Sequence, residues 1–411
     1  MTFFIMPHTF NQRGKKYGGG DSEIIFEKCS YELFSGMTST GKKIFNLLQK
    51  KGAMPKSEIS NITGIKLTTL NRIMEPLEGN RILVQYCIGE STGGRKPIVY
   101  NINLCNFYII GINISVEEVE IAFTNLKLEI LHKEMFKMNY SFTPEKVLDY
   151  IVKSINKVYI ELNLDFLSLF GIGVSVQGSF QFKSGVMHDC TNTWSDVKIK
   201  NILEEKLGVY VVIENGANAA AEAEYFYGLK TEFSNMTYIH CGKKFRAGII
   251  VDGKIFRMLN NDENVFGHMI VDRGKFGCID NYSSTGAIIE QFILKLKKGR
   301  NSIINKPIDE ITCKDICEAA KMNDELSIEI IRNAAILLGI GLINLIQMFN
   351  LKAVVLNGEI ISYSKIFYDT CVETVFKNIK SKIVFKRGGY LKEDAMVVGA
   401  AAVVIEKYLE N

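Results

Sequence analysis

The sequence predicts an α/β protein in which an N-terminal winged helix-turn-helix precedes a larger two-lobed body. Two short helices around a glycine-containing turn, with two strands behind them, lie within the first 105 residues. Strands and helices then alternate in two successive strand-rich and helix-rich halves, a pattern typical of a duplicated α/β body with a cleft between its lobes. At roughly 100–200 residues per domain, a chain of 411 residues has room for both parts.

The expected domain boundaries follow these changes in pattern. A Gly-rich, polar segment near the N-terminus predicts a flexible arm over 1–37, and the winged helix follows over 38–105. The body begins at 106 and runs to the end of the chain. We expect its first lobe at 106–228, with a C-terminal helix at 394–411, and its second lobe at 229–393.

Charge is distributed unevenly along the chain. Residues 1–100 hold 14 Lys and Arg against 8 Asp and Glu, a net charge of +6. The other residues hold 35 against 37, a net charge of −2. A basic head on a nearly neutral body favours a polyanionic partner for the head, although the same surplus could simply keep an ordinary surface soluble.

Cysteine usage and hydropathy predict a cytoplasmic protein with no membrane partner. The nine cysteines are an odd number, and no signal-peptide pattern precedes them. The longest apolar runs, Ala334–Ile343 and Met396–Ile405, are shorter than the roughly 20 residues that cross a bilayer. Cys313 and Cys317 lie one helical turn apart, and we expect them to be packing residues.

A glycine-rich segment near the start of the head resembles a phosphate-binding loop only in part. Gly36–Lys42 matches G-x-x-x-x-G-K, but Lys43 stands where a P-loop needs Ser or Thr to bind magnesium. No apolar strand precedes the segment. We therefore expect a helix N-terminus capped by a residue of Thr38–Thr40.

The following residues predict a helix-turn-helix. A short helix starts at Pro55 and ends at Thr63–Gly64, and a second one covers 66–77. Pro76 is expected to distort the last turn and shorten the second helix. The predicted apolar stripe of this helix is Leu67, Leu70, Ile73, Met74 and Leu77. Its outward positions carry donors and short hydroxyls suited to base edges and phosphates, namely Lys66, Thr68, Thr69, Asn71 and Arg72.

Two strands with a basic tip complete the winged helix. The strands are expected at 81–86 and 98–102, and the tip carries Gly93, Gly94, Arg95 and Lys96. The two glycines let the backbone approach closely, and Arg95 and Lys96 can enter a minor groove or bind phosphates of double-stranded DNA. The alternative is an ordinary small helical domain with a solvated basic hairpin. The predicted DNA contacts are Lys56, Ser57, Lys66, Thr68, Thr69, Asn71, Arg72, Arg95 and Lys96.

The body reads as alternating strands and helices. We expect strands at 107–114, 119–124, 128–136, 169–176, 209–214, 236–241, 247–256 and 352–358. We expect helices at 144–162, 199–207, 217–227 and 325–349.

Several segments in a fixed order resemble the ROK family. These are GIGVSVQGSF, then NTWSD, then VIENGANAAAEAEYFYG, then FGHMIVD, all behind a winged helix that carries Gly93-Gly94-Arg95. The family contains bacterial sugar kinases and sugar-responsive regulators of the xylose-repressor and N-acetylglucosamine-repressor type. The resemblance implies an actin- and hexokinase-like (ribonuclease H-like) fold for the body.

Departures from the family pattern argue against phosphoryl transfer. The resemblance places the base that activates the sugar hydroxyl at position 216, which is Gly here. The first phosphate loop has become Asn113–Glu117, and the second Gly242–Gly248, with bulky side chains where backbone amides should approach phosphate. We therefore expect no enzymatic activity and no catalytic residue.

The family's zinc site is also incomplete. His268 and Cys278 remain, but Val271 and Arg273 stand at the other two ligand positions. Two ligands cannot build a closed tetrahedral site, so no metal or cofactor is expected. His268 is then either a sugar contact or a core histidine.

The resemblance implies a partly retained sugar pocket. Its matching positions are Gly178, Asn192, Asn215, His268 and Asp280. Carboxylates are missing at Gly216 and Val265, which should weaken and redirect recognition. The alternative is that these residues persist only for packing and that no sugar binds.

Together these features predict a sequence-specific transcriptional regulator, most simply a repressor of carbohydrate genes such as those for xylose. The resemblance implies a homodimer or homotetramer and a possible sugar effector. A sugar kinase with an accessory DNA-binding head, or a ligand-independent DNA-binding scaffold, remain the alternatives.

Overall fold

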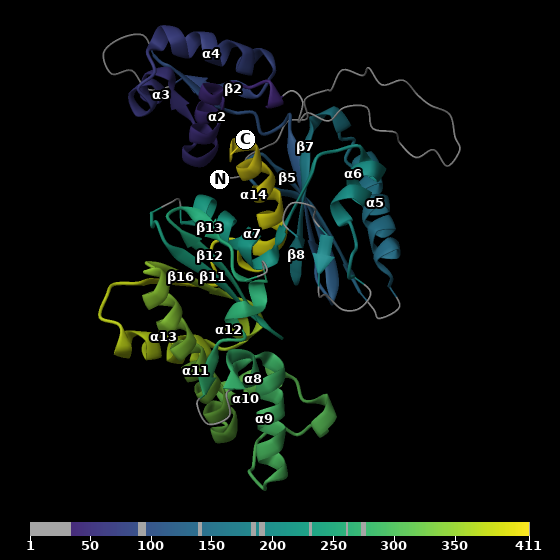
Figure 1. Ribbon diagram of the computed structural model, residues 1–411, viewed down its shortest axis with the longest axis vertical. Coiled ribbons are helices and arrows are strands. Elements are labelled where there is room, and N and C mark those ends of the chain that lie inside the picture. Colours follow the sequence, from purple (N-terminus) through teal and green to yellow (C-terminus); the bar gives the residue numbers. More distant parts are fainter. Residues whose placement is uncertain are drawn as a thin grey trace.

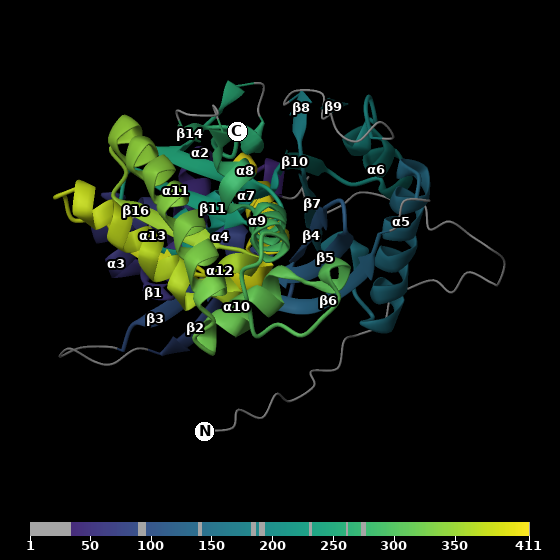
Figure 2. The same cartoon turned by 90° about the horizontal axis from the view of Figure 1, so that it is seen from below.

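The computed structural model describes residues 34–88, 96–138, 142–181, 186–188, 194–229, 232–259, 262–272 and 277–410. The winged helix lies at one end of the long axis of the molecule (Figure 1). The two sheets of the body lie on opposite sides of the C-terminal helix, and helices of the second half of the body lie at the other end of the long axis. Seen along the perpendicular direction, the helices of the second half cluster together on one side of the molecule (Figure 2).

The head has the predicted winged-helix arrangement. Its helices are α2 (Ser39–Lys51), α3 (Lys56–Thr63) and α4 (Leu67–Gly79), and its strands are β1 (Met54–Pro55), β2 (Leu83–Ile88) and β3 (Ile98–Ile102). The three strands form an antiparallel sheet in the order β1-β3-β2. Thr38 caps α2 by accepting a hydrogen bond from the Gly41 amide at 3.1 Å, which confirms the capped helix start.

Two expectations for α4 are wrong. The helix continues past Pro76 to Gly79, because proline removes only one amide donor and lies here on the exposed side. Leu67 is 50% exposed, whereas Leu70, Met74 and Leu77 are buried. The apolar face of α4 therefore begins one turn later than its periodicity suggests, since Leu67 lies at the edge of the head's core.

The first sheet of the body has the strand order β10-β7-β4-β5-β6. Strands β5 and β6 pair antiparallel to their neighbours, and β7 and β10 pair parallel. The strands are β4 (Tyr108–Ile114), β5 (Glu118–Asn125), β6 (Ile130–Lys137), β7 (Leu169–Val176) and β10 (Val211–Asn215).

The second sheet repeats this topology in the order β13-β12-β11-β16-β17. The repeat supports the predicted duplication. The expected single strand 247–256 is instead two strands, because Asp252 and Gly253 both adopt positive φ and turn the chain. The strands are β11 (Met236–Cys241), β12 (Phe245–Val251), β13 (Lys254–Phe256), β16 (Ala353–Asn357) and β17 (Val384–Arg387).

Helices cover both sheets. The first sheet packs against α5 (Pro144–Glu161), α6 (Ile199–Leu207), α7 (Gly216–Ala223) and α14 (Ala395–Glu410). Further helices of the second half are α8 (Ile279–Ser283), α9 (Thr285–Lys297), α10 (Cys313–Lys321), α11 (Glu325–Phe349), α12 (Glu359–Tyr363) and α13 (Lys365–Asn378). Short paired strands are β8 (Ser179–Gln181) with β9 (Val186–His188), and β14 (Ile270–Asp272) with β15 (Gly277–Cys278).

Helix α11 is long and apolar enough to cross a membrane by length and composition alone, but just over half of its most apolar stretch is buried inside the protein. Its buried residues join the core of the second half, which also contains Cys313 and Cys317. Both cysteines therefore pack as small apolar side chains, as predicted.

The C-terminal helix α14 lies directly on the first sheet. Gly111 in β4 and Gly173 in β7 allow this approach, because a Cβ atom at either position would overlap a backbone carbonyl of α14. The opposite side of α14 contacts α7 near Ala219. Helix α14 thus lies at the centre of the body (Figure 1).

The far end of α14 holds the head. Phe34 is fully buried and stacks edge-on with Phe45, Phe107 and Phe170, and its carbonyl accepts a hydrogen bond from the Tyr408 hydroxyl at 2.8 Å. One hydrophobic cluster continues from the head through α14 into the first sheet. The expected arm over 1–37 is therefore too long, because Phe34 belongs to this packed junction; residues 1–33 lie outside the described chain.

Candidate functional site

The DNA-facing surface predicted for the head is exposed. Five polar residues of the α4 region are exposed, namely Lys66, Thr68, Thr69, Asn71 and Arg72. Ser57 of α3 and Lys96 just before the second wing strand are exposed as well. Lys66 precedes α4 without capping it through its side chain. None of the five forms a side-chain hydrogen bond or ion pair with another described residue. Arg95, which the sequence predicts for the tip of the wing, lies outside the described residues.

Lys56 differs from the other predicted DNA contacts. Its ammonium group is half-buried, lies 3.3 Å from the Glu78 carboxylate and stands 4.6 Å from the centre of the Tyr100 ring. Lys56 therefore links α3 to α4 and β3. A phosphate contact from Lys56 would have to compete with these partners.

The predicted effector residues in the first half of the body gather at the start of α7. Asn215 is fully buried, and its side-chain amide donates to the Gly178 carbonyl at 2.7 Å. Gly178 has positive φ, which lets the chain turn away from the end of β7. Asn192 lies outside the described residues.

Position 216, where the family pattern has a base, is surrounded by other side chains. A Cβ atom on Gly216 would lie 3.1 Å from the Met396 sulfur and 3.7 Å from Arg246 Nη1. The Ala217 amide donates to Glu263 Oε2 at 2.6 Å, and Glu263 Oε1 lies 3.5 Å from Arg246 Nη1. Burial raises the pKa of Glu263, and Arg246 and the Ala217 amide oppose that rise.

Sequence reasoning missed the Glu263–Arg246 pair. The family pattern has a carboxylate at position 265, which is Val here, and Glu263 lies two residues before it. The contact of Glu263 with α7 joins segments that are far apart in the chain. Only the fold reveals this pairing. The Glu263 carboxylate thus lies beside Gly216, but it already accepts a hydrogen bond from the Ala217 amide and pairs with Arg246.

In the second half of the body, the predicted residues His268 and Asp280 lie near each other. Asp280 Oδ1 accepts from the Phe245 amide at 2.8 Å, and the Asp280 amide donates to the Gly267 carbonyl at 3.0 Å. Burial raises the pKa of Asp280, whereas the Phe245 amide, His268 and Lys244 act in the opposite direction. His268 is exposed, so it is not a core histidine.

The residues at the family's zinc position do not fit a structural zinc ion. His268 and Cys278 are the two retained ligand types, and Val271 offers no donor atom. Residue 273 lies outside the described chain. Across the described residues, no group of three or more His, Cys, Asp and Glu side chains is placed to hold a metal ion.

The two segments that match the family's phosphate loops are joined by an ion pair. Lys243, in the turn between β11 and β12, contacts the carboxylate of Glu117, in the turn between β4 and β5. Glu359, at the start of α12, lies near both: burial and Glu117 raise its pKa, and Lys243 lowers it. Charged side chains of this chain thus meet where the family pattern places nucleotide phosphates.

Carboxylates are also buried behind α7. Glu214 forms a bidentate ion pair with Arg257, at 2.8 and 2.5 Å. Glu222, near the C-terminal end of α7 itself, has a carboxylate oxygen with no hydrogen-bond partner among the described residues. Burial, with Glu214 and Glu406 nearby, raises the pKa of Glu222 to about 8.

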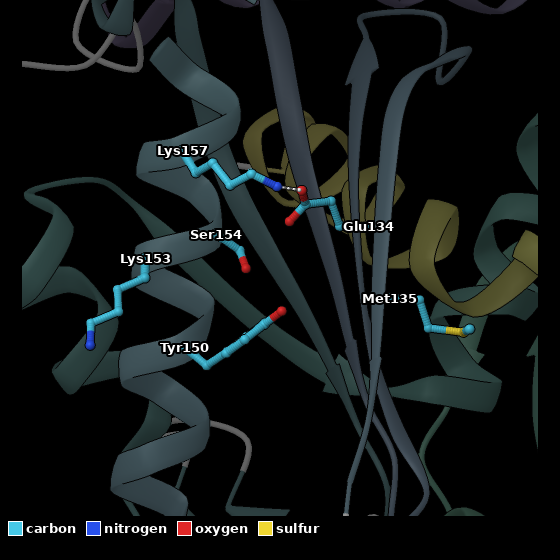
Figure 3. A pocket seen from close by; sticks show the side chains of 6 residues that line it. All are labelled: Glu134, Met135, Tyr150, Lys153, Ser154 and Lys157. Atoms are coloured by element: carbon cyan, nitrogen blue, oxygen red, sulfur yellow. Dashed lines mark hydrogen bonds and ion pairs between the residues drawn. The ribbon is translucent and has the colours of Figure 1, made fainter. Parts of the chain in front are cut away.

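A separate cavity of about 400 Å³ lies between α5 and the edge strand β6 (Figure 3). Lys157 and Glu134 form an ion pair across it at 2.9 Å, and Tyr150 points into it, whereas Lys153 and Met135 point away. None of the predicted site residues lines this cavity.

The fold and these sites define a winged-helix protein with a two-lobed, sugar-kinase-like body. The model of the ROK family matches residues 109–407, and a model of winged helix-turn-helix DNA-binding domains matches residues 37–83. The chain belongs to the ROK family.

Named relatives align over most of this chain. The xylose repressor of Caldicellulosiruptor bescii is 27% identical over 372 residues, which cover 86% of this chain and 92% of that protein. The N-acetylglucosamine repressor of Escherichia coli O157:H7 is 24% identical over 345 residues, covering 80% and 84%. The crystal structure of a ROK family transcriptional regulator, a homolog of the E. coli MLC protein, shares the fold with a TM-score of 0.76 at 19% identity, covering 92% of this chain and 100% of that chain.

Proposed function

We propose that this protein is a sequence-specific, DNA-binding repressor of carbohydrate-utilisation genes in the cytoplasm. The observation that carries the proposal is the exposed polar face of α4, in a winged helix attached to a ROK body. Exposed donors on the second helix of a helix-turn-helix suit the base edges of a major groove. The similarity to xylose and N-acetylglucosamine repressors supports genes of sugar use as the target.

The body acts as a sensor without phosphoryl transfer in this proposal. Gly216 has no side chain to accept a proton from a sugar hydroxyl. The loops that would hold nucleotide phosphates carry Glu117 and Lys243, which contact each other. Negative charge from Glu117 and Glu359 disfavours phosphates at this position.

The effector in this proposal is a sugar bound near Gly178, Asn215, His268 and Asp280. Asn215 and Asp280 already have partners in the chain, so a sugar must replace or extend those hydrogen bonds. A xylose-type sugar is the first candidate, because the xylose repressor of C. bescii covers both parts of the chain.

Helix α14 supplies the path from effector to DNA. Met396 at its start lies beside Gly216, and Tyr408 at its end is bonded to Phe34. Lys50 of α2 pairs with Glu406 at 2.9 Å, and Lys42 donates to the Tyr408 carbonyl at 2.9 Å. Because these contacts join α14 to the head, a movement of α14 should also move the head. In a homodimer, such a shift changes the spacing between two heads and hence operator affinity.

A binding titration on the DNA upstream of the protein's own gene tests the proposal. We expect specific binding that falls when a pentose or hexose effector is added. Phosphorylation of a sugar with ATP, lost on mutation of Asn215, would instead favour the kinase. Specific DNA binding that no sugar alters would favour a ligand-independent scaffold.

A further inference from the structure

The first residue of α4 carries an aliphatic side chain on the surface. Leu67 is 50% exposed, although it continues the apolar spacing of Leu70 and Met74. Those two residues are fully buried in the head. Packing therefore explains at most half of the Leu67 side chain.

The neighbours of Leu67 are polar. Residues four apart lie side by side on a helix, so Leu67 and Asn71 form one row, and Thr68 and Arg72 form the next. A single exposed leucine needs no explanation on an ordinary surface. Here it lies within the face that the proposed function assigns to DNA, at the end of the helix that enters the groove first.

The exposed face of α4 becomes acidic after its first two turns. Glu75, one turn beyond Asn71 and Arg72, is exposed and carries a charge of the same sign as phosphate. Contacts with DNA are therefore concentrated on the first two turns of α4. Helix α4 lies along the outer end of the head, away from both sheets of the body (Figure 1).

We propose that Leu67 reads thymine methyl groups in the operator, beside Asn71 reading adenine. Thymine is the base that presents a methyl group in the major groove, and an apolar side chain favours that methyl. Asn pairs with the N6 and N7 edge of adenine. Each operator half-site then has A·T base pairs under the first turn of α4. This inference rests on the proposed DNA-binding function.

Uracil substitution tests the contact by removing only the methyl group. A duplex selected by the full-length protein from a random library is synthesised with deoxyuridine at each thymine in turn, and affinity is measured by fluorescence anisotropy. We expect about a fourfold loss at one or two positions in each half-site, the effect of one buried methyl group.

The variant Leu67→Ala should bind more weakly and be indifferent to uracil at those positions. Ile160→Ala, which shortens an exposed aliphatic side chain on α5, is the matched control and should keep the wild-type response. Wild-type affinity that no uracil changes, or an undiminished uracil response in Leu67→Ala, overturns the inference while specific binding stands. Failure to select any preferred duplex overturns the proposed function itself.

Discussion

The second helix of the helix-turn-helix, α4, and the start of α7 use polar side chains in opposite ways. On α4, Thr68, Asn71 and Arg72 are exposed and have no partner among the described residues. At the start of α7, Asn215 and Glu263 are buried and hydrogen-bonded within the chain. The side chains on α4 can therefore form hydrogen bonds with another molecule, whereas those at the start of α7 already bond to other parts of the chain. A ligand of the head would meet side chains with no partner in the described chain, whereas a ligand at the start of α7 would have to replace hydrogen bonds that the chain already makes.

The largest effect should come from breaking a buried pair of the body. Arg257→Ala leaves the Glu214 carboxylate, which is 1% exposed, without its bidentate partner. Unpaired buried charges cost about 3–5 kcal/mol of unfolding free energy. Denaturant unfolding measures this loss. Lys157→Ala is the control, because Lys157 is exposed and the loss of its ion pair with Glu134 should have little effect on stability. Equal losses in the two variants would show that the Glu214–Arg257 pair does not stabilise the fold.

Removing an exposed donor of the head should affect binding and spare stability. Arg72→Ala is expected to weaken operator binding roughly 30-fold, the effect of one lost base or phosphate contact. Its melting temperature should stay within experimental error of the wild type. Arg332→Ala, an exposed arginine on α11, should bind as the wild type does. If both variants bind normally, the assigned DNA surface is wrong.

A smaller, pH-dependent effect should come from Glu222. Its pKa is raised to about 8 in the folded protein, so between about pH 4.5 and pH 8 the unfolded chain loses this proton and the folded chain keeps it. Stability should therefore fall as pH rises through this window. Glu222→Gln should be about 1–2 kcal/mol more stable than the wild type at pH 8 and similar at pH 4.

Thermal melts of the two proteins across this range measure the difference. Glu214 and Glu406, which raise the pKa of Glu222, and Lys407, which lowers it, remain in both proteins. A gap between the two proteins that is independent of pH would contradict the assignment to Glu222.

The smallest effect should come from restoring the family carboxylate. Gly216→Asp is expected to produce no ATP-dependent sugar phosphorylation, because the Lys243–Glu117 pair still occupies the region of the phosphate loops. Coupled ATPase assays with pentoses and hexoses measure this. Turnover in the variant would show that position 216 alone separates this body from a kinase.

The sequence predicted those parts of the fold that have local signals. Strand β7 at 169–176 and helix α11 at 325–349 match their predicted bounds, since each is a long apolar run with clear ends. The apolar periodicity of α4 includes Leu67, which is half exposed, because periodicity does not show where a core ends. The contact of Glu263 with Ala217 depends on how two distant segments pack, and no local pattern indicates it.

Operator selection followed by competition binding at physiological salt tests the central claim most directly. The full-length protein should select a recurring duplex and bind it on the order of 10³-fold more tightly than random DNA. Arg72→Ala should reduce that ratio, and Arg332→Ala should not. Equal affinity for the selected and random duplexes, with both variants binding like the wild type, would contradict a sequence-specific regulator.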